Sequence, residues 1–243
     1  MDNITTIIFD VGNTLRIVVK DPAFAADAER ELMELVGTTE AHDAFFEKLE
    51  ANYKKYRKYA KTGLLDASET ELWTQWMLPD YDVNRVAKHS ARLTRLWRNH
   101  DGRRVARADC RSTIEELYKR GYTLGIIANT ITESEIPDWM VEDEVVGYFK
   151  TVVLSSKVRI RKPDPEIYLL TARVLGVRPE ECAYVGDNPV RDVEGAHAAN
   201  YGAMILLHEQ ATVDREPPKD GIEAPDAVIY SLSDLLGLFP GIQ

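Results

Sequence analysis

Polar side chains suited to phosphoryl chemistry follow apolar runs at three places in the chain. Asp10, Asn129 and Asp187 each stand at or just past the end of a segment that predicts a buried strand. Ligands of open α/β sheets bind outside the carboxyl ends of the strands, so these positions suit a nucleophile or a metal ligand. Asp10 taken alone is equally well explained as a turn-forming Asp. The apolar runs are Ile4 to Phe9, Leu124 to Ala128 and Cys182 to Val185.

Two further charged residues complete this set. Lys162 directly precedes Pro163, and with Pro165 two residues further on the backbone there is doubly restricted. A rigidly presented ammonium group suits a phosphate. Asp192 follows Asp187 by five residues, at the opening of a predicted helix. Two carboxylates near one strand end suit a hard cation with oxygen ligands.

The elements that must position these residues alternate after residue 100. Strand-like and helix-like segments in alternation predict a parallel sheet with crossover helices, an α/β doubly wound fold. A polar stretch, Val213 to Pro225, predicts a surface loop before a short strand and a last helix. The predicted segments are Cys110 to Arg120, Thr123 to Ala128, Thr132 to Met140, Thr151 to Leu154, Pro165 to Leu175, Cys182 to Val185, Val190 to Ala199, Ala203 to Leu206, Ala227 to Ile229 and Ser231 to Leu238.

A helical block separates the first predicted strand from the second. Between about Arg16 and His100, apolar residues recur at spacings of three and four, and no strand is expected there. Ser68 with Glu71 predicts a capping box, and three tryptophans are expected to pack the interior of the block. The predicted helices are Ala23 to Val36, Thr39 to Lys61, Ser68 to Met77 and Val83 to Arg98, and the tryptophans are Trp73, Trp76 and Trp97.

The four chemistry-bearing segments resemble, in order, the signature motifs of the haloacid dehalogenase-like (HAD) hydrolase superfamily. The resemblance runs from Ile4 to about Leu206. It implies a Rossmann-like core, residues 1–15 and 101–243, with an inserted helical cap, residues 16–100. The motifs are Phe9-Asp10-Val11-Gly12-Asn13-Thr14-Leu15, Ala128-Asn129-Thr130, Arg161-Lys162-Pro163-Asp164-Pro165 and Val185-Gly186-Asp187-Asn188-Pro189-Val190-Arg191-Asp192.

The resemblance implies a role for each matching residue. Asp10 is expected as the nucleophile, Lys162 as the catalytic partner that neutralises charge, and Asn129 as a catalytic group that orients the transferring phosphoryl group. Thr14, Asn129 and Lys162 are expected to bind the substrate. The resemblance also implies Mg²⁺ as cofactor, bound by Asp10, the Gly12 carbonyl, Asp187 and Asp192. The implied activity is a phosphatase acting on a small phosphorylated metabolite through an Asp10 phosphoryl-enzyme.

Two departures from the family pattern bear on that activity. Gly12 stands where phosphatases of the family carry a second Asp, the general acid and base. Ala128 stands where a Ser or Thr hydroxyl is usual. Loss of general acid–base catalysis is expected to slow hydrolysis of poor leaving groups by roughly 10²- to 10⁴-fold. Dehalogenation, phosphonate cleavage by a cap lysine, and phosphate-ligand binding without turnover therefore stay open as alternatives.

Composition and charge exclude other classes of function. The formal net charge of −10 argues against a nucleic-acid-binding surface. No apolar run reaches about 18 residues, and no basic or apolar signal segment precedes the first strand. We therefore expect neither a membrane span nor secretion, and the expected location is the cytoplasm. The sequence indicates no oligomeric state. The basic and aromatic tract from Tyr53 to Lys61 is interpreted mainly as a solvated helix face with packed tyrosines, against an alternative surface for anionic substrates.

Overall fold

The computed structural model, which describes residues 1, 3–218, 221 and 223–242, has a parallel sheet at its centre. Strand β1 (Thr6–Phe9) lies between β4 (Thr123–Ala128) and β6 (Cys182–Gly186), and the order across the sheet is β5-β4-β1-β6-β7-β8. All pairings in this sheet are parallel, so the predicted α/β doubly wound fold is confirmed. The remaining strands of the sheet are β5 (Phe149–Leu154), β7 (Ala203–Leu207) and β8 (Ala227–Ile229).

Helices cover both faces of the sheet. Alternate β1 side chains point to opposite faces: Ile7 and Phe9 pack in one apolar cluster and Ile8 in another. The first cluster includes residues of α5 (Cys110–Lys119), α6 (Glu135–Glu142) and α11 (Leu235–Leu238), and the second includes residues of α8 (Pro165–Leu175) and α9 (Arg191–Ala198). Shorter helical elements are η2 (Val146–Tyr148), α7 (Ser155–Val158), η3 (Pro179–Glu181), α10 (Gln210–Arg215) and η4 (Leu232–Asp234).

The register of the central strands brings their ends to one edge. Phe9 is paired with Ile126 on one side and with Val185 on the other. The residues that follow these strands therefore emerge close together at the carboxyl edge of the sheet. This edge holds the residues that the sequence singles out for chemistry.

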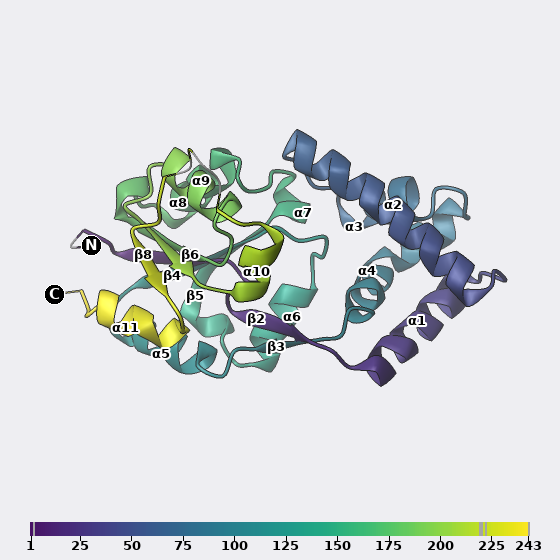
Figure 1. Cartoon of the computed structure of the whole chain (residues 1–243), viewed down its shortest axis with the longest axis horizontal. Coiled ribbons are helices and arrows are strands. Elements are labelled where there is room, and N and C mark those ends of the chain that lie inside the picture. Colours follow the sequence, from purple (N-terminus) through teal and green to yellow (C-terminus); the bar gives the residue numbers. More distant parts are fainter. Residues whose placement is uncertain (2, 219–220, 222, 243) are drawn as a thin grey trace.

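A helical half, α1 to α4, lies beside this core and has its own apolar interior (Figure 1). Trp73 and Trp97 are buried in it as predicted, whereas Trp76 is partly buried. Ser68 and Glu71 form the predicted capping box. The helices are α1 (Pro22–Val36), α2 (His42–Gly63), α3 (Glu69–Glu71), its π-helical continuation η1 (Leu72–Met77), and α4 (Val83–Asn99).

A strand at Arg16–Val19 corrects the prediction that no strand occurs between about Arg16 and His100. β2 (Arg16–Val19) pairs antiparallel with β3 (Arg103–Ala106) to form a separate ribbon. Each strand is four residues long and largely exposed, and its partner lies far along the chain, so the local apolar pattern carries no strand signal.

Smaller differences concern where helices begin. α6 starts at Glu135 rather than Thr132, because the Thr132 hydroxyl accepts hydrogen bonds from the backbone N–H groups of Ser134 and Glu135. The predicted loop from Val213 to Pro225 is in part helical, since α10 continues to Arg215. Neither feature has a strong apolar pattern.

Candidate functional site

Asp10 leaves the end of β1 as a buried carboxylate with a fixed backbone. Its N–H donates to the Val185 carbonyl at 2.8 Å, and the residue is 4% exposed. One carboxylate oxygen, Oδ1, accepts from the Lys162 ammonium at 2.7 Å. The other, Oδ2, lies 3.5 Å from the buried Thr14 hydroxyl. Asp10 thus presents one oxygen that is firmly held and one that is weakly held.

Lys162 is buried and its ammonium group is surrounded by oxygen atoms. Besides Asp10, Nζ lies 3.0 Å from Asp192 Oδ1 and donates to the Tyr184 hydroxyl at 2.5 Å. The Tyr184 ring also faces the ammonium, at 5.1 Å from its centroid. A lysine held by three oxygens in the interior stays in a fixed position beside Asp10.

Asn129 contacts the backbone of Lys162 through both ends of its amide. Its Nδ2 donates to the Lys162 carbonyl and its Oδ1 accepts from the Lys162 N–H, each at 2.8 Å. Asn129 therefore braces the segment that carries the lysine. The predicted direct role on a transferring group is not tested by this geometry.

Asp10, Asp187 and Asp192, here called the acidic cluster, are buried and offer oxygen atoms within 4.8 Å of one another. Burial and the neighbouring Asp10 charge raise the pKa of Asp187 to about 7. The Thr212 hydroxyl, from α10, donates to Asp187. Burial would raise the pKa of Asp192 too, but Arg191 and Lys162 overcome it and hold that pKa well below its usual range.

The donor set of the acidic cluster fits a hard divalent cation. All three side chains offer carboxylate oxygens, the ligands that Mg²⁺ prefers. Within the described residues, three carboxylates face two cations, Lys162 and Arg191, so one negative charge is left over. Gly12 lies in the turn after β1, bridged to Arg16, and its carbonyl as a ligand stays a prediction.

Arg191 is a site residue that the sequence reasoning missed. Its guanidinium lies 3.0 Å from Asp192, 3.6 Å from Asp10 and 3.7 Å from Asp187. Its position inside the fourth motif, one residue before Asp192, could have identified it, but only the acidic residues of that motif were assigned a role. Thr212 and Tyr184 were missed as well, because neither belongs to a motif and each reaches the site only through folding.

A cavity of about 360 Å³ opens beside these groups. Lys162 and Arg191 line its inner side, and Arg57 and Lys61 of α2 line it from the helical half. We call it the reaction pocket. Its other lining residues are Leu64, Arg161, Pro163, Val190, Glu194, Arg215 and Glu216.

Comparison with known proteins gives one family match over most of the chain. A family model described as haloacid dehalogenase-like hydrolase matches residues 4–200. A glyceraldehyde 3-phosphate phosphatase of Methanopyrus kandleri is 28% identical over 208 residues, which cover 77% of this chain and 87% of that protein. A Thermus thermophilus phosphoserine phosphatase and a Salmonella typhi phosphoglycolate phosphatase are each 32% identical, over 123 and 136 residues. These matches cover 50% and 51% of this chain but only 46% and 47% of the two relatives.

Solved structures of similar fold include proteins of both chemistries. A 2-haloacid dehalogenase from Pseudomonas syringae pv. Tomato DC3000 superposes with a TM-score of 0.69 at 20% identity, covering 97% of each chain. A HAD phosphatase from Thermococcus onnurineus gives a TM-score of 0.60 at 21% identity, covering 98% of this chain and 99% of the other. At such identities the likeness shows the fold alone. No helix in the described part of the chain has the length and apolar character to cross a bilayer.

Proposed function

The chain belongs to the haloacid dehalogenase-like hydrolase family, and from this premise we propose that it is a Mg²⁺-dependent phosphatase of small phosphorylated metabolites. The observation that carries the proposal is the Asp10 carboxylate, buried at a strand end and 2.7 Å from the Lys162 ammonium. The phosphatase names of the curated relatives support the same reaction class.

Asp10 acts as the nucleophile in this proposal. Oδ2, the oxygen not bonded to Lys162, attacks phosphorus in line while the bond to the leaving oxygen breaks. Lys162, 2.7 Å from Asp10 Oδ1, and Arg191, 3.6 Å from Asp10 Oδ2, would stabilise the negative charge that gathers on the phosphoryl oxygens. Water then attacks phosphorus, which releases inorganic phosphate and restores Asp10.

The acidic cluster would hold Mg²⁺, which supplies charge neutralisation at the phosphoryl group when bound. Asp187 is available for this, because in the described part of the chain only the Thr212 hydroxyl donates a hydrogen bond to its side chain, and its nearest cation, Arg191, lies 3.7 Å away. Asn129 keeps Lys162 in position through the paired backbone contacts. Gly12 supplies no proton, so the leaving oxygen must take one from solvent or leave as an anion.

Hydrolysis of three phosphate esters with different leaving groups tests the proposal. We expect Mg²⁺-dependent turnover of an aryl phosphate and an acyl phosphate, with an alkyl phosphate slower by about 10²-fold or more. Asp10→Asn is expected to reduce the aryl phosphate rate at least about 10³-fold, since it removes the nucleophile. An Asp10→Asn protein that keeps the wild-type rate would exclude covalent catalysis by this residue.

Gly12→Asp provides the complementary gain-of-function test. A Cβ at this position meets no atom of the described residues within 4 Å, so an Asp side chain can start there without a clash at its first carbon. We expect the variant to raise the alkyl phosphate rate by about 10²- to 10⁴-fold and the aryl phosphate rate much less. Gly12→Asn, which has the same shape but no acid, is the control. Equal rates for the two variants would contradict the missing-acid explanation.

Dehalogenation is the second candidate function, because Gly12 leaves the site without the acid that phosphate esters need and halide requires none. Displacement of chloride from a 2-chloro acid by Asp10, unaffected by a metal chelator, would favour it over phosphoryl transfer. The negative charge left over in the acidic cluster is the reason to rank it second, because it suits a divalent cation that halide displacement does not need.

A further inference from the structure

Basic side chains on the C-terminal part of α2 line a second cleft, next to the reaction pocket. The cleft has a volume of about 750 Å³ and lies between α2 and the end of α4. We call it the α2 cleft. Its basic lining residues are Lys54, Arg57, Lys58 and Lys61 on α2 and Arg98, His100 and Arg104 opposite; the others are Glu50, Ala51, Tyr53, Trp97, Asp101 and Ile131.

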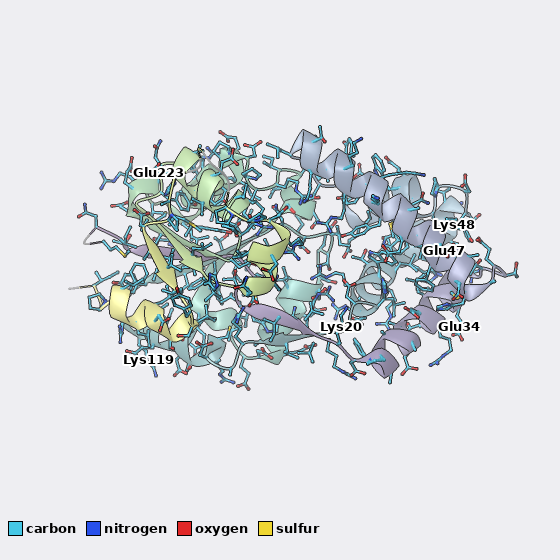
Figure 2. The ribbon with its side chains drawn as sticks, in the orientation of Figure 1. Lys20, Glu34, Glu47, Lys48, Lys119 and Glu223 are labelled. Carbon is cyan, nitrogen blue, oxygen red and sulfur yellow. The ribbon has the colours of Figure 1, made fainter. Side chains whose placement is uncertain are left out.

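A lysine near each end of α2 pairs with a glutamate, but only the lysine near the C-terminal end lines a cavity. Lys48, labelled in Figure 2 near the outer end of the helix, is bound by Glu40 and Tyr81 and lines neither cavity. The C-terminal end of α2 extends toward the core (Figure 1), where Lys61 pairs with Glu216 at 2.9 Å. Tyr53 and Tyr56 pack inward, which agrees with the packed tyrosines expected from the sequence.

The wall of the α2 cleft that lies opposite α2 also carries positively charged side chains. Arg98 and Arg104 form, with Arg16, an arginine cluster around one buried carboxylate, Glu135. Burial and the neighbouring Arg98 charge lower the pKa of Arg104 to about 10. Asp101 is a further partner of Arg104 at 3.4 Å, but it is exposed. Seven basic residues thus line the cleft against Glu50 and Asp101, in a chain whose net charge is −10.

Two residues join the α2 cleft to the reaction pocket. Arg57 and Lys61 line both cavities, whereas Lys162 and Arg191 line the reaction pocket alone. A molecule with its phosphoryl group at Lys162 can therefore extend along α2 past Arg57 without leaving a surface lined by cations. Clefts of one charge sign raise the local concentration of oppositely charged ligands.

We propose that the α2 cleft binds a second anionic group of the substrate, a carboxylate or phosphate remote from the phosphoryl group that is transferred. This inference rests on the proposed function, because Asp10 and Lys162 fix the position of the first anion. Arg57 and Lys61 are the residues that select for the second. The substrate class is then a phosphate monoester with an anionic tail.

Binding of such an anion replaces an internal contact of Lys61. Glu216, its present partner, also accepts a hydrogen bond from Asn188 of the fourth motif. The Lys61–Glu216 pair is partly exposed, so it is weak and gives way to a ligand anion at small cost. Entry of the tail and release of Glu216 are coupled events at the mouth of the reaction pocket.

Calorimetric titration with phosphonates that a phosphatase does not hydrolyse tests the proposal. The probes are ω-carboxyalkylphosphonates and α,ω-bisphosphonates of two to five carbons, each compared with the uncharged-tail alkylphosphonate of equal length. We expect at least one charged-tail probe to bind about tenfold more tightly than its alkyl control. The carboxylate and phosphonate arms distinguish which anion the cleft prefers.

Paired variants assign the effect to the α2 cleft. In an Arg57→Gln/Lys61→Gln protein we expect the ratio of charged-tail to alkylphosphonate affinity to fall to about onefold, and this ratio is the readout because both residues also line the reaction pocket. Lys55→Gln is the matched control, since Lys55 lies on the same helix, bonds to Asn52 and lines neither cavity. Equal affinities for charged and uncharged tails in the wild type, or a preference that survives the double substitution, would overturn the proposal.

The readout separates this inference from the proposed function. Hydrolysis of the ester panel without any charged-tail preference in binding would reject the anion subsite and leave the phosphatase intact. The opposite result is a wild-type protein that hydrolyses no ester but prefers charged tails, with the preference lost in Arg57→Gln/Lys61→Gln. It would reject the phosphatase and retain the anion subsite.

Discussion

The acidic cluster is buried and the arginine cluster is partly buried around Glu135, and their charges are balanced in opposite ways. At the carboxyl edge of the sheet, three carboxylates share two cations. Beside α6, three guanidinium groups share Glu135, with the exposed Asp101 as an outer partner. The first arrangement carries a surplus of negative charge and the second a surplus of positive charge. This difference agrees in sign with the cation that we propose for the acidic cluster and the anion that we propose for the α2 cleft.

The largest effect on stability is expected from Glu135→Gln. The substitution leaves three guanidinium groups, one buried and two partly buried, without the buried carboxylate that they share, and removing one partner of a buried ionic group typically costs about 3–5 kcal/mol. Urea unfolding of wild type and variant measures the change. Asp138→Asn is the control, because Asp138 is exposed and pairs with Arg95 alone among the described residues. A loss below about 1 kcal/mol for Glu135→Gln would show that the arginine cluster is not held by this carboxylate.

Mg²⁺ is expected to stabilise the protein through the acidic cluster. At a concentration about 100 times Kd, a ligand that binds only the folded state contributes about 2.7 kcal/mol. Thermal unfolding with Mg²⁺ and with a chelator at pH 7.5 measures this difference. We expect Asp187→Asn to remove most of it, since the variant loses a charged ligand. An unchanged Mg²⁺ effect in the variant would place the cation elsewhere.

The two clusters predict opposite dependences of stability on pH. Burial opposes ionisation of Glu135, but Arg98 and the other arginines outweigh it and lower its pKa to about 2. Its contribution is therefore complete above about pH 4.5 and is lost as the pH falls toward 2, on the order of 3 kcal/mol. The contribution of Asp187, whose pKa is raised to about 7, depends on pH in the opposite direction. Without metal, the free energy of unfolding falls as the pH rises from about 4 to 7. Chemical denaturation across this range, with Glu135→Gln and Asp187→Asn, separates the two slopes. A slope that persists in its own variant contradicts the assignment.

The smallest effect is expected at the mouth of the reaction pocket. Glu216→Gln removes the partner of Lys61 and should change unfolding free energy by less than about 0.5 kcal/mol, because the pair is partly exposed. The same variant should bind charged-tail phosphonates about twofold more tightly, since Lys61 is then free to contact the tail. Weaker binding of these probes would show that Glu216 helps the ligand instead of competing with it.

Residues that sequence reasoning could place are those at the ends of strongly apolar strands. Asp10 and Asp187 were located correctly in the fold because a parallel sheet brings its strand ends to one edge. Arg191 and Thr212 were not identified. The long side chain of Arg191 and the short polar helix α10, which carries Thr212, make their contacts only in the folded protein. Their identification needed the folded arrangement.

The same limit explains the missed ribbon. β2 and β3 are far apart in the chain and bury few side chains, so no apolar periodicity in the sequence predicts them. By contrast, α1 and α4 were predicted to within one residue, since apolar residues at helical spacing are a local signal.

The ribbon also has a consequence for how the chain reaches this fold. Arg16 lies opposite Ala106, so the strand pair brings together the two points where the helical half leaves and rejoins the core. Once the ribbon and its helices have formed, β1 and β4 are joined by a short effective loop despite their wide separation in sequence. Pairing them then carries a much smaller loop-closure entropy than the length of the intervening segment suggests. The helical half can thus be replaced, lengthened or shortened in related chains while the central strands still find one another.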